Sequence, residues 1–325
     1  MTSLQYFKIR FRLVSPLGTP LAADTLFGHL CWSIAYGHGG ETALTEFLNA
    51  MNGETPPLLL SDPFPAGMLP VPILPSVNQQ KWQEKSTEEQ DRLKTLRKRT
   101  FMPETAFRDC CGNLSPDRLL QVHPETDVSA SGKETALVPH NHIDRIGGGT
   151  IQGGIFFHED VFVDHQPGKM YDMFDLYVAS FELDADRIKK MLFKATEGGY
   201  GRDKSTGRGV IDWQNIEPWI PPKVANANAV MLLGPCVPEA NDPTDGYWKI
   251  KAKAGRLGGH WAIDENPFKK TIMMLQTGSV LKTETPKPFY GRMVEQAHPN
   301  LPEVRHYGLA LALPIHLDLT EERAA

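Results

Sequence analysis

The sequence has few cysteines and no excess of basic residues. Its 325 residues include four cysteines, and none of them has the C-x-x-C spacing of a metal-binding or redox motif. The adjacent pair Cys110 and Cys111 is a poor candidate for a structural disulfide. This cysteine usage is typical of a reducing compartment, so we expect a cytoplasmic protein. The formal net charge is -5, so any contact with nucleic acid must come from a local basic surface.

Long apolar runs and nucleotide-binding or metal-binding motifs are also missing. No stretch approaches the length of a transmembrane helix, and residues 1–14 alternate like a strand rather than forming a secretory signal. A Walker loop is excluded because Asp203 stands where a glycine should precede Lys204 and Ser205. Acidic pairs such as Glu159 and Asp160 lack the spacing of a magnesium site, and we interpret them as solvated turn carboxylates. We therefore expect no membrane span, no metal and no other cofactor.

The most informative segment that is present is the glycine-rich run GGYGRDKSTGRGVI, residues 198–211. Its glycines permit positive φ and close approach of a ligand, Arg202, Lys204 and Arg208 supply charge, and two hydroxyl side chains supply donors. The preceding residues 184–196 have helical spacing with Asp184 as a cap, and residues 210–216 alternate like a strand. This order is the reverse of a nucleotide-binding loop. The pattern predicts a cradle for a phosphate backbone, and a surface loop with ordinary turn glycines is the alternative.

The first residues predict a strand followed by a helix. Apolar side chains at positions 7, 9, 11 and 13 alternate with Lys8, Arg10 and Arg12, which form either a basic contact face or a solvated sheet edge. Residues 23–37 have helical spacing, with Asp24 or Thr25 as the expected cap. Gly28 lies inside this helix, where glycine costs about 1 kcal/mol relative to alanine. A close neighbour, either backbone or ligand, would explain it.

The order of the remaining segments predicts an α+β fold with two domains. Residues 155–163 and 176–183 read as strands, whereas residues 55–150 contain a proline-rich connector, a charged helix-prone stretch and an irregular polar region at 103–136. Treating 55–150 as one long insertion leaves strand, helix, strand, strand, helix, strand, which is the ferredoxin-like (RRM-like) order. A strand-rich unit follows from residue 221, including an alternating lysine strand over 247–253. The predicted domains are residues 1–220 and 221–325, the second also ferredoxin-like.

Seven segments in this order resemble the RAMP superfamily of CRISPR-associated proteins, and within it the fourth subunit of type III-A Csm complexes, the Cas-five-type group. The segments are ADTLFGHLCWSIAYG at 23–37, LSDPFPAGMLPVPILP at 60–75, HNHIDRIGGGT at 140–150, GGYGRDKSTGRG at 198–209, LQTGSV at 275–280, FYGRMV at 289–294 and RHYGLALALP at 305–314. The resemblance covers most of the chain. It implies a RAMP fold and a subunit that is not the nuclease of its complex.

The resemblance also implies partners and site residues. It implies binding of the repeat-derived 5′ tag of CRISPR RNA (crRNA) and a bridge between the large Palm-domain subunit and the first Cas-seven-type backbone subunit, in antiviral defence. Main-chain groups and cations would hold the sugar-phosphate, and bases could rest on aromatic or apolar surfaces. The predicted RNA-binding residues are Asn141, Arg145, Gly199, Gly201, Arg202, Lys204, Ser205, Thr206, Gly207, Arg208 and Gly209. No catalytic residue and no metal ligand is expected.

Two other functions stay open. Related RAMP proteins process CRISPR RNA by metal-independent acid-base chemistry, for which His29 and His38 are candidates, with Tyr36 or Lys204 as helpers. A histidine on a helix more often packs or forms a hydrogen bond, which favours the non-catalytic interpretation. The pair His140 and His142 lacks a third ligand for a metal. The remaining possibility is an interaction protein that touches no RNA.

Overall fold

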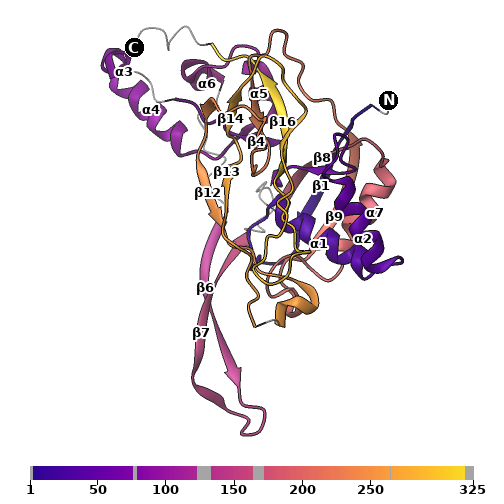
Figure 1. Cartoon of the computed structure of the whole chain (residues 1–325). Coiled ribbons are helices and arrows are strands. Elements are labelled where there is room, and N and C mark those ends of the chain that lie inside the picture. The colour runs from indigo at the N-terminus through magenta and orange to yellow at the C-terminus, as the bar shows by residue number, and fades with distance from the viewer. Residues whose placement is uncertain (1–2, 76–78, 123–132, 164–171, 264, 319–325) are drawn as a thin grey trace.

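The computed structural model describes residues 3–75, 79–122, 133–163, 172–263 and 265–318. These residues form a mixed α and β fold that is built on antiparallel sheets (Figure 1). The two larger sheets have five strands each, and apolar side chains of both contribute to one hydrophobic core. Within the described ranges, no helix is both long enough and apolar enough to cross a membrane.

The first sheet holds the strands that frame the glycine-rich segment. Its strands are β1 (Gln5–Leu13), β2 (Leu59–Leu60), β3 (Phe64–Pro65), β8 (Met173–Ser180) and β9 (Ile211–Pro218). The order is β2-β8-β1-β9, and β3 also pairs with β8. The alternation in β1 is confirmed, because its four apolar side chains at positions 7, 9, 11 and 13 are buried.

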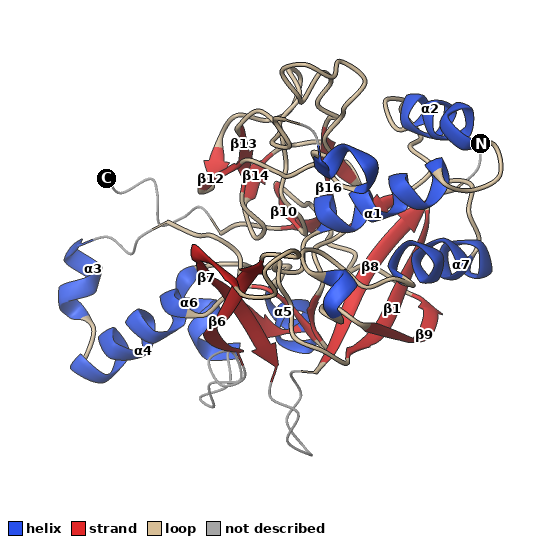
Figure 2. Cartoon of the chain, turned by 90° about the horizontal axis from the view of Figure 1, so that it is seen from below, coloured by secondary structure: helices blue, strands red, loops and turns tan. Residues whose placement is uncertain are grey.

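Three helices lie together on one side of this sheet (Figure 2): α1 (Ala23–Ala35), α2 (Gly40–Ala50) and α7 (Ala185–Thr196). The predicted cap of α7 is confirmed, since Asp184 accepts a hydrogen bond from the Arg187 amide at 2.8 Å. The predicted cap of α1 is wrong. Its N-cap is Ala22, because Tyr200 Oη and Asp62 Oδ1 already accept the first two amide hydrogens of this helix start, those of residues 22 and 23.

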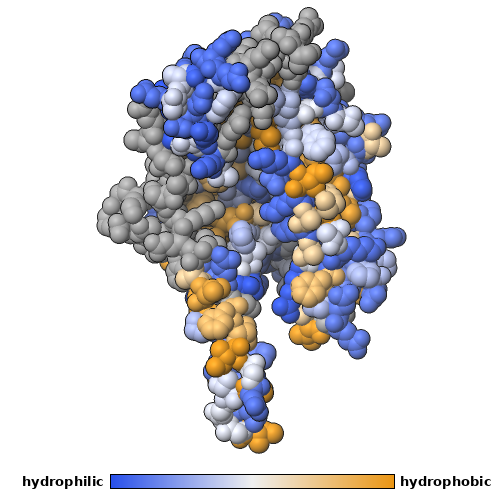
Figure 3. Space-filling view, turned by 90° about the vertical axis from the view of Figure 1, so that its left-hand side faces the viewer, coloured by the Kyte–Doolittle hydropathy of each residue, from blue (hydrophilic) through white to orange (hydrophobic). Residues whose placement is uncertain are grey.

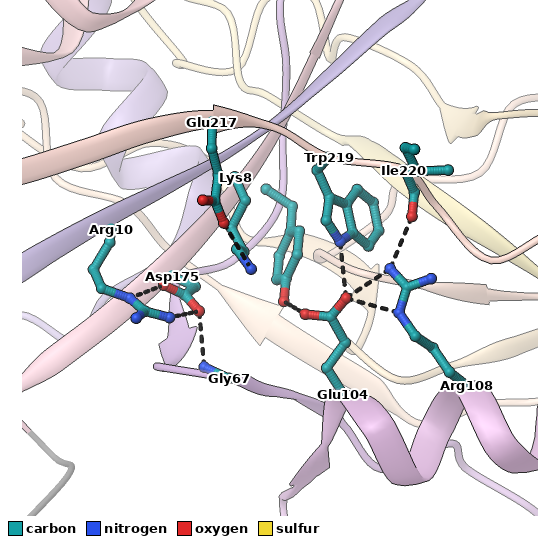
Figure 4. A network of polar contacts seen from close by, with 10 residues as sticks. Lys8, Arg10, Gly67, Glu104, Arg108, Asp175, Glu217, Trp219 and Ile220 are labelled. Carbon is teal, nitrogen blue, oxygen red and sulfur yellow. Dashed lines mark hydrogen bonds and ion pairs between the residues drawn. The ribbon is translucent and has the colours of Figure 1, made fainter.

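The second face of β1 is neutralised by carboxylates. β1 lies between β8 and β9, so the sheet-edge interpretation of its cations is wrong. Its three basic residues form ion pairs: Lys8 with Glu217 at 3.0 Å and Arg10 with Asp175 at 2.8 Å (Figure 4), and Arg12 with Asp172 at 2.8 Å. Asp175 is fully buried, and its second oxygen also accepts from the Gly67 amide. Asp175 thereby links Arg10 of β1 to the segment that follows β3.

The segment after β3 supplies a cover for that face. It contains the ribbon β4 (Met68–Pro70) and β5 (Phe101–Pro103) and the helices α3 (Gln79–Glu84), α4 (Thr87–Lys98), α5 (Glu104–Cys110) and α6 (Pro116–Val122). The prediction of an irregular region at 103–136 is wrong for α5 and α6 and for residues 133–136, which form strand, and residues 123–132 lie outside the described part. Short helices escape a periodicity search, yet Phe107 of α5 is fully buried.

A long β-hairpin projects from the body (Figure 1), formed by β6 (Lys133–Ile143) and β7 (Thr150–Val163). The strand expected at 155–163 is therefore present, but it pairs with β6 and does not belong to the first sheet. In the predicted ferredoxin-like order, residues 155–163 would be the strand beside β8, but β2 occupies that position. Two residues are too few for an alternation to reveal such a strand.

The second large sheet has the order β11-β14-β10-β16-β15. Its strands are β10 (Ala229–Leu232), β11 (Gly246–Tyr247), β14 (Val280–Lys282), β15 (Phe289–Gly291) and β16 (Leu309–Ile315), and β12 (Ile250–Lys253) pairs with β13 (Ile272–Leu275) as a separate ribbon. The strand expected over 247–253 is thus interrupted between β11 and β12. Tyr307 joins the two sheets, because its hydroxyl accepts the Leu60 amide hydrogen of β2 at 2.9 Å. The division at residue 220 stays a prediction.

Candidate nucleic-acid interface

The glycine-rich loop runs from the end of α7 to β9 and contains one short turn of 3-10 helix, η1 (Lys204–Thr206). Gly199, Gly201, Gly207 and Gly209 all have positive φ, between 67° and 90°. At Gly209 a side chain is also excluded by space, because its Cβ would overlap the carbonyl oxygen of Tyr200. The sequence prediction that glycines shape this loop is confirmed for these four positions.

The base of the loop is fixed to the turn between β1 and α1. The Tyr200 hydroxyl donates to the Pro20 carbonyl oxygen at 2.9 Å, and the Gly209 amide donates to the Pro16 carbonyl oxygen at 2.8 Å. The Arg202 amide donates to Thr19 Oγ1 at 3.0 Å. Tyr200 is 1% exposed, so its side chain is buried beneath the loop. The loop is therefore held in one shape before any ligand arrives.

The side chain of His29 supports the same loop from α1. Its Nε2 accepts the Gly201 amide hydrogen at 2.9 Å, and its ring centroid lies 5.3 Å from that of Tyr200. Burial, together with the positive charge of Lys204, lowers the pKa of His29 to about 4. The ring is therefore neutral at pH 7, with its remaining proton on Nδ1.

The two arginines of the loop face the base of the hairpin. Arg208 Nη2 lies 2.6 Å from Asp160 Oδ2 on β7, and Arg202 Nη2 lies 3.8 Å from the other oxygen of the same carboxylate. Arg202 also donates to the Glu159 carbonyl oxygen at 3.2 Å. The interpretation of Asp160 as a solvated carboxylate is wrong, because it is fully buried under the two guanidinium groups. The prediction that Arg202 and Arg208 touch RNA stays a prediction.

The tip of the loop faces solvent. Lys204, Ser205, Thr206 and Gly207 are all exposed, while the arginines on either side are only partly so. The tip is closed by the Thr206 amide and hydroxyl, which both donate to the Asp203 carbonyl oxygen. The Lys204 ammonium and the Ser205 hydroxyl are therefore presented together on a rigid turn, which is an arrangement suited to phosphate oxygens.

The other two predicted RNA-binding residues lie far from this loop, near the tip of the hairpin. Asn141 on β6 donates to Thr150 Oγ1 across the strands at 3.2 Å, and Arg145 lies exposed in the turn that joins β6 to β7. In the register Asn141 pairs with Ile155 and Ala136 pairs with Asp160, so five strand residues, or roughly 17 Å at the usual rise of a strand, separate Asn141 from the level of Asp160. The structure therefore places the predicted site residues in two groups.

The hairpin carries apolar side chains that have no core to pack against. Leu137, Ile155 and Phe157 are each about 60–70% exposed. They share one face with Asn141, because Asn141 is paired with Ile155 in the register. Figure 3 shows hydrophobic atoms gathered along the projecting hairpin. The sequence predicted a strand over 155–163 but not this exposed apolar face.

The structure also gathers residues that the sequence did not connect. Trp32 and Tyr36 of α1 meet His260 and Trp261, far along the chain. Of the ribonuclease candidates, Tyr36 contacts His260, whereas His29 contacts the loop that carries Lys204. Within the described ranges, no three side chains of His, Cys, Asp or Glu gather closely enough to hold a metal ion.

Comparison with solved structures identifies the fold. The chain is similar to a chain of the Csm1-Csm4 cassette in complex with AMPPNP, with 18% identity, a TM-score of 0.59 and coverage of 96% of this chain and 98% of that one. It is similar to a chain of the Csm3-Csm4 subcomplex of the type III-A CRISPR-Cas interference complex, with 13% identity, a TM-score of 0.56 and coverage of 96% and 99%. No protein-family model and no curated protein matches the sequence. The chain thus has the fold of these CRISPR-associated chains over nearly its whole length.

Proposed function

We propose that the chain is the Csm4-type subunit of a type III CRISPR effector complex, that it binds the 5′ tag of crRNA, and that it catalyses no reaction itself. In that role it contacts the large Palm-domain subunit on one side and the first backbone subunit on the other. It works in the cytoplasm, where its four cysteines, all free thiols in the structure, stay reduced.

The observation that carries the proposal is the near-complete overlap with chains of two different assemblies. Csm4 is the one component that the names of both assemblies share, and each match covers at least 98% of the other chain. The order β2-β8-β1-β9, with α1 and α7 on one side, supports a ferredoxin-like first unit. The seven sequence segments point to the same subunit independently of the fold comparison.

The geometry of the glycine-rich loop supports RNA contact at its tip. Lys204, Ser205 and Thr206 are exposed on a turn that hydrogen bonds to the body hold in place. A preformed turn loses little conformational entropy when it binds, so even a few phosphate contacts contribute affinity. The two arginines behind it would act chiefly through Asp160, which they hold against the loop.

The state of His29 supports a subunit without ribonuclease activity. A general acid or base works best with a pKa near the working pH, whereas the pKa of His29 is lowered to about 4. Its Nε2 is already occupied by the Gly201 amide. His29 is therefore suited to support the loop and poorly suited to transfer protons at neutral pH.

The test is tag binding by matched lysine variants. Lys204→Ala should weaken binding of tag RNA several-fold and make the slope of log affinity against log salt shallower by about one. Lys190→Ala, which removes an exposed lysine from α7, is the control and should bind as the unchanged protein does. Equal affinity and equal salt slope for all three proteins would contradict loop binding.

Assembly and catalysis are tested separately. Co-expressed with a large Palm-domain subunit, a backbone subunit and crRNA, the chain should copurify with all three. Incubation of the purified chain with repeat RNA in EDTA should leave the RNA intact. Cleavage at one site that is abolished by His29→Ala would replace the proposal with a processing endoribonuclease.

A further inference from the structure

Four aromatic side chains form a surface cluster at the C-terminal end of α1. Trp32 lies at its centre, with ring centroids 5.4 Å from Tyr36, 5.3 Å from His260 and 5.2 Å from Trp261. His260 and Trp261 belong to a 3-10 helix, η2 (Gly259–Ile263). Tyr36 is 64% exposed, which is unusual for a large aromatic ring at the end of a packed helix. We call these four residues the aromatic cluster.

The Tyr36 ring is fixed although it is exposed. Its hydroxyl accepts the His260 amide hydrogen at 3.1 Å and lies 3.3 Å from His260 Nδ1. Gly258 and Gly259 leave no room between the backbone and the indole of Trp32, because a Cβ at either position would overlap that ring. A rigid, solvent-facing aromatic ring offers stacking area at little cost in conformational entropy.

The outer face of α1 connects the aromatic cluster to the glycine-rich loop. His29, Trp32 and Tyr36 follow one another at helical spacing, so His29 at the loop and Tyr36 at the cluster are roughly 10 Å apart along the helix. Gly28 lies beside this stripe, and a Cβ at that position would meet nothing within 4 Å. Packing against the protein therefore does not explain the glycine, which leaves a ligand as the neighbour that the sequence calls for.

Charge identifies the kind of ligand. Exposed Lys204 lies close enough to His29 to lower its pKa, and exposed Lys194 places its Nζ 3.3 Å from where a Cβ of Gly37 would be. Cations therefore flank both ends of the stripe, with open helix surface and aromatic rings between them. Phosphates beside lysines and a base on an aromatic ring are the contacts of a single-stranded nucleic acid.

We propose that the outer face of α1 is an RNA-binding path and that the Tyr36 ring, with the aromatic cluster behind it, stacks on one unpaired base of the RNA. The inference rests on the proposed function, because the glycine-rich loop holds the phosphates of the same strand. Gly28 keeps the path open between them. The chain thus takes part in base contact at a place outside the predicted RNA-binding residues.

The test uses the full chain and a short single-stranded RNA that carries a fluorescent purine analogue, placed at each position in turn. Stacking quenches this analogue, so one position should be quenched on binding. Tyr36→Ala should abolish the quenching and weaken affinity by roughly 5-fold to 100-fold, whereas Tyr36→Phe should retain both. An RNA with an abasic site at that position should bind the unchanged protein as weakly as the intact RNA binds Tyr36→Ala. This second measurement needs no protein variant.

The outcomes separate this inference from the proposed function. If Lys204→Ala weakens binding while Tyr36→Ala and the abasic RNA do not, the stacking site is wrong and loop binding stands. If Tyr36→Ala and the abasic site weaken binding while Lys204→Ala does not, the stacking site stands and loop binding fails. If Tyr36→Ala leaves RNA binding and fluorescence unchanged but releases a protein subunit, the cluster is a protein contact and the inference is overturned.

Discussion

Arg208 in the glycine-rich loop and Asp160 in the hairpin form an ion pair with 2.6 Å between Nη2 and Oδ2. The carboxylate is fully buried, and Arg202 approaches it from the other side. One acidic residue therefore couples the two groups of predicted RNA-binding residues, those of the loop and those of the hairpin. The hydrogen bond from Arg202 to the Glu159 carbonyl oxygen joins the same two parts.

Asp160→Asn should destabilise the protein and loosen the base of the hairpin. The substitution removes a buried charge that neutralises two guanidinium groups, so we expect a loss of roughly 1 to 3 kcal/mol in the free energy of unfolding. Urea unfolding measures the loss, and hydrogen exchange of the amides at the open end of β6 and β7 measures the loosening. Faster exchange should be confined to that end and to the loop.

Asp172→Asn is the matched control for that prediction. It breaks the ion pair with Arg12, whose side chain is 49% exposed, so the change in stability should not exceed about 1 kcal/mol. Equal losses for Asp160→Asn and Asp172→Asn would show that the buried contact contributes no more to the free energy of unfolding than the exposed one.

Substitutions at Gly28 should affect stability and RNA binding in opposite directions. Gly28→Ala should raise the free energy of unfolding by about 1 kcal/mol, since alanine favours a helix and its Cβ meets no neighbour. Gly28→Gln should also be stabilising but should obstruct the outer face of α1 and weaken RNA binding at least several-fold. Thermal unfolding and RNA titration of the same samples measure both effects. Unchanged RNA affinity in Gly28→Gln would place the RNA elsewhere.

Asp62→Asn should stabilise the protein at neutral pH and not in acid. Burial raises the pKa of Asp62 to about 6, although hydrogen bonds from Thr277 and the Ala23 amide oppose the rise. An acid whose folded pKa is raised contributes full stability below its unfolded pKa of 3.8 and loses it as pH rises to about 6. The uncharged amide avoids that loss, a difference of roughly 3 kcal/mol. Urea unfolding near pH 4 should show little difference between the proteins, and near pH 7 the full one.

His29→Gln should reduce the acid sensitivity of the protein. The folded pKa of His29, about 4, lies below its unfolded value of 6.5, so its contribution is complete above pH 6.5 and is lost as pH falls toward 4. Glutamine takes up no proton in this pH range. Its side-chain amide oxygen can still accept the Gly201 amide hydrogen. The drop in unfolding free energy from about pH 7 to about pH 4 should therefore be smaller, by at most roughly 3 kcal/mol. The pKa of His306 is also lowered to about 4. His306 is unchanged in the variant, so its own contribution to acid sensitivity should remain.

Elements with a strong local pattern could be predicted from the sequence. β1 and β9 show through their alternation, and α7 through its spacing and the Asp184 cap. The glycine-rich loop was predictable as well, because only glycine adopts positive φ freely at several close positions. In each case the physical cause lies within a few residues of chain.

Features that depend on distant partners could not be predicted. The start of α1 is fixed by Tyr200 and Asp62 instead of by a local cap. Residues 155–163 could be predicted as a strand, but a strand prediction does not say which strand will pair with it. The partner of the loop arginines was missed for the same reason, since Asp160 resembles a surface carboxylate until the hairpin is placed beside the loop.

The hydrogen bond between Tyr307 and Leu60 has a consequence for how copies of this chain can associate. β2 closes one edge of the first sheet, and an open edge would be a template for an additional strand. The Tyr307 hydroxyl occupies the Leu60 amide hydrogen there, so sheet extension is blocked on that side. The opposite edge is β9, where the exposed charge of Asp212 disfavours pairing with a second copy of the same strand. The edge strands β2 and β9 are therefore both poor templates for pairing with a second copy of the chain.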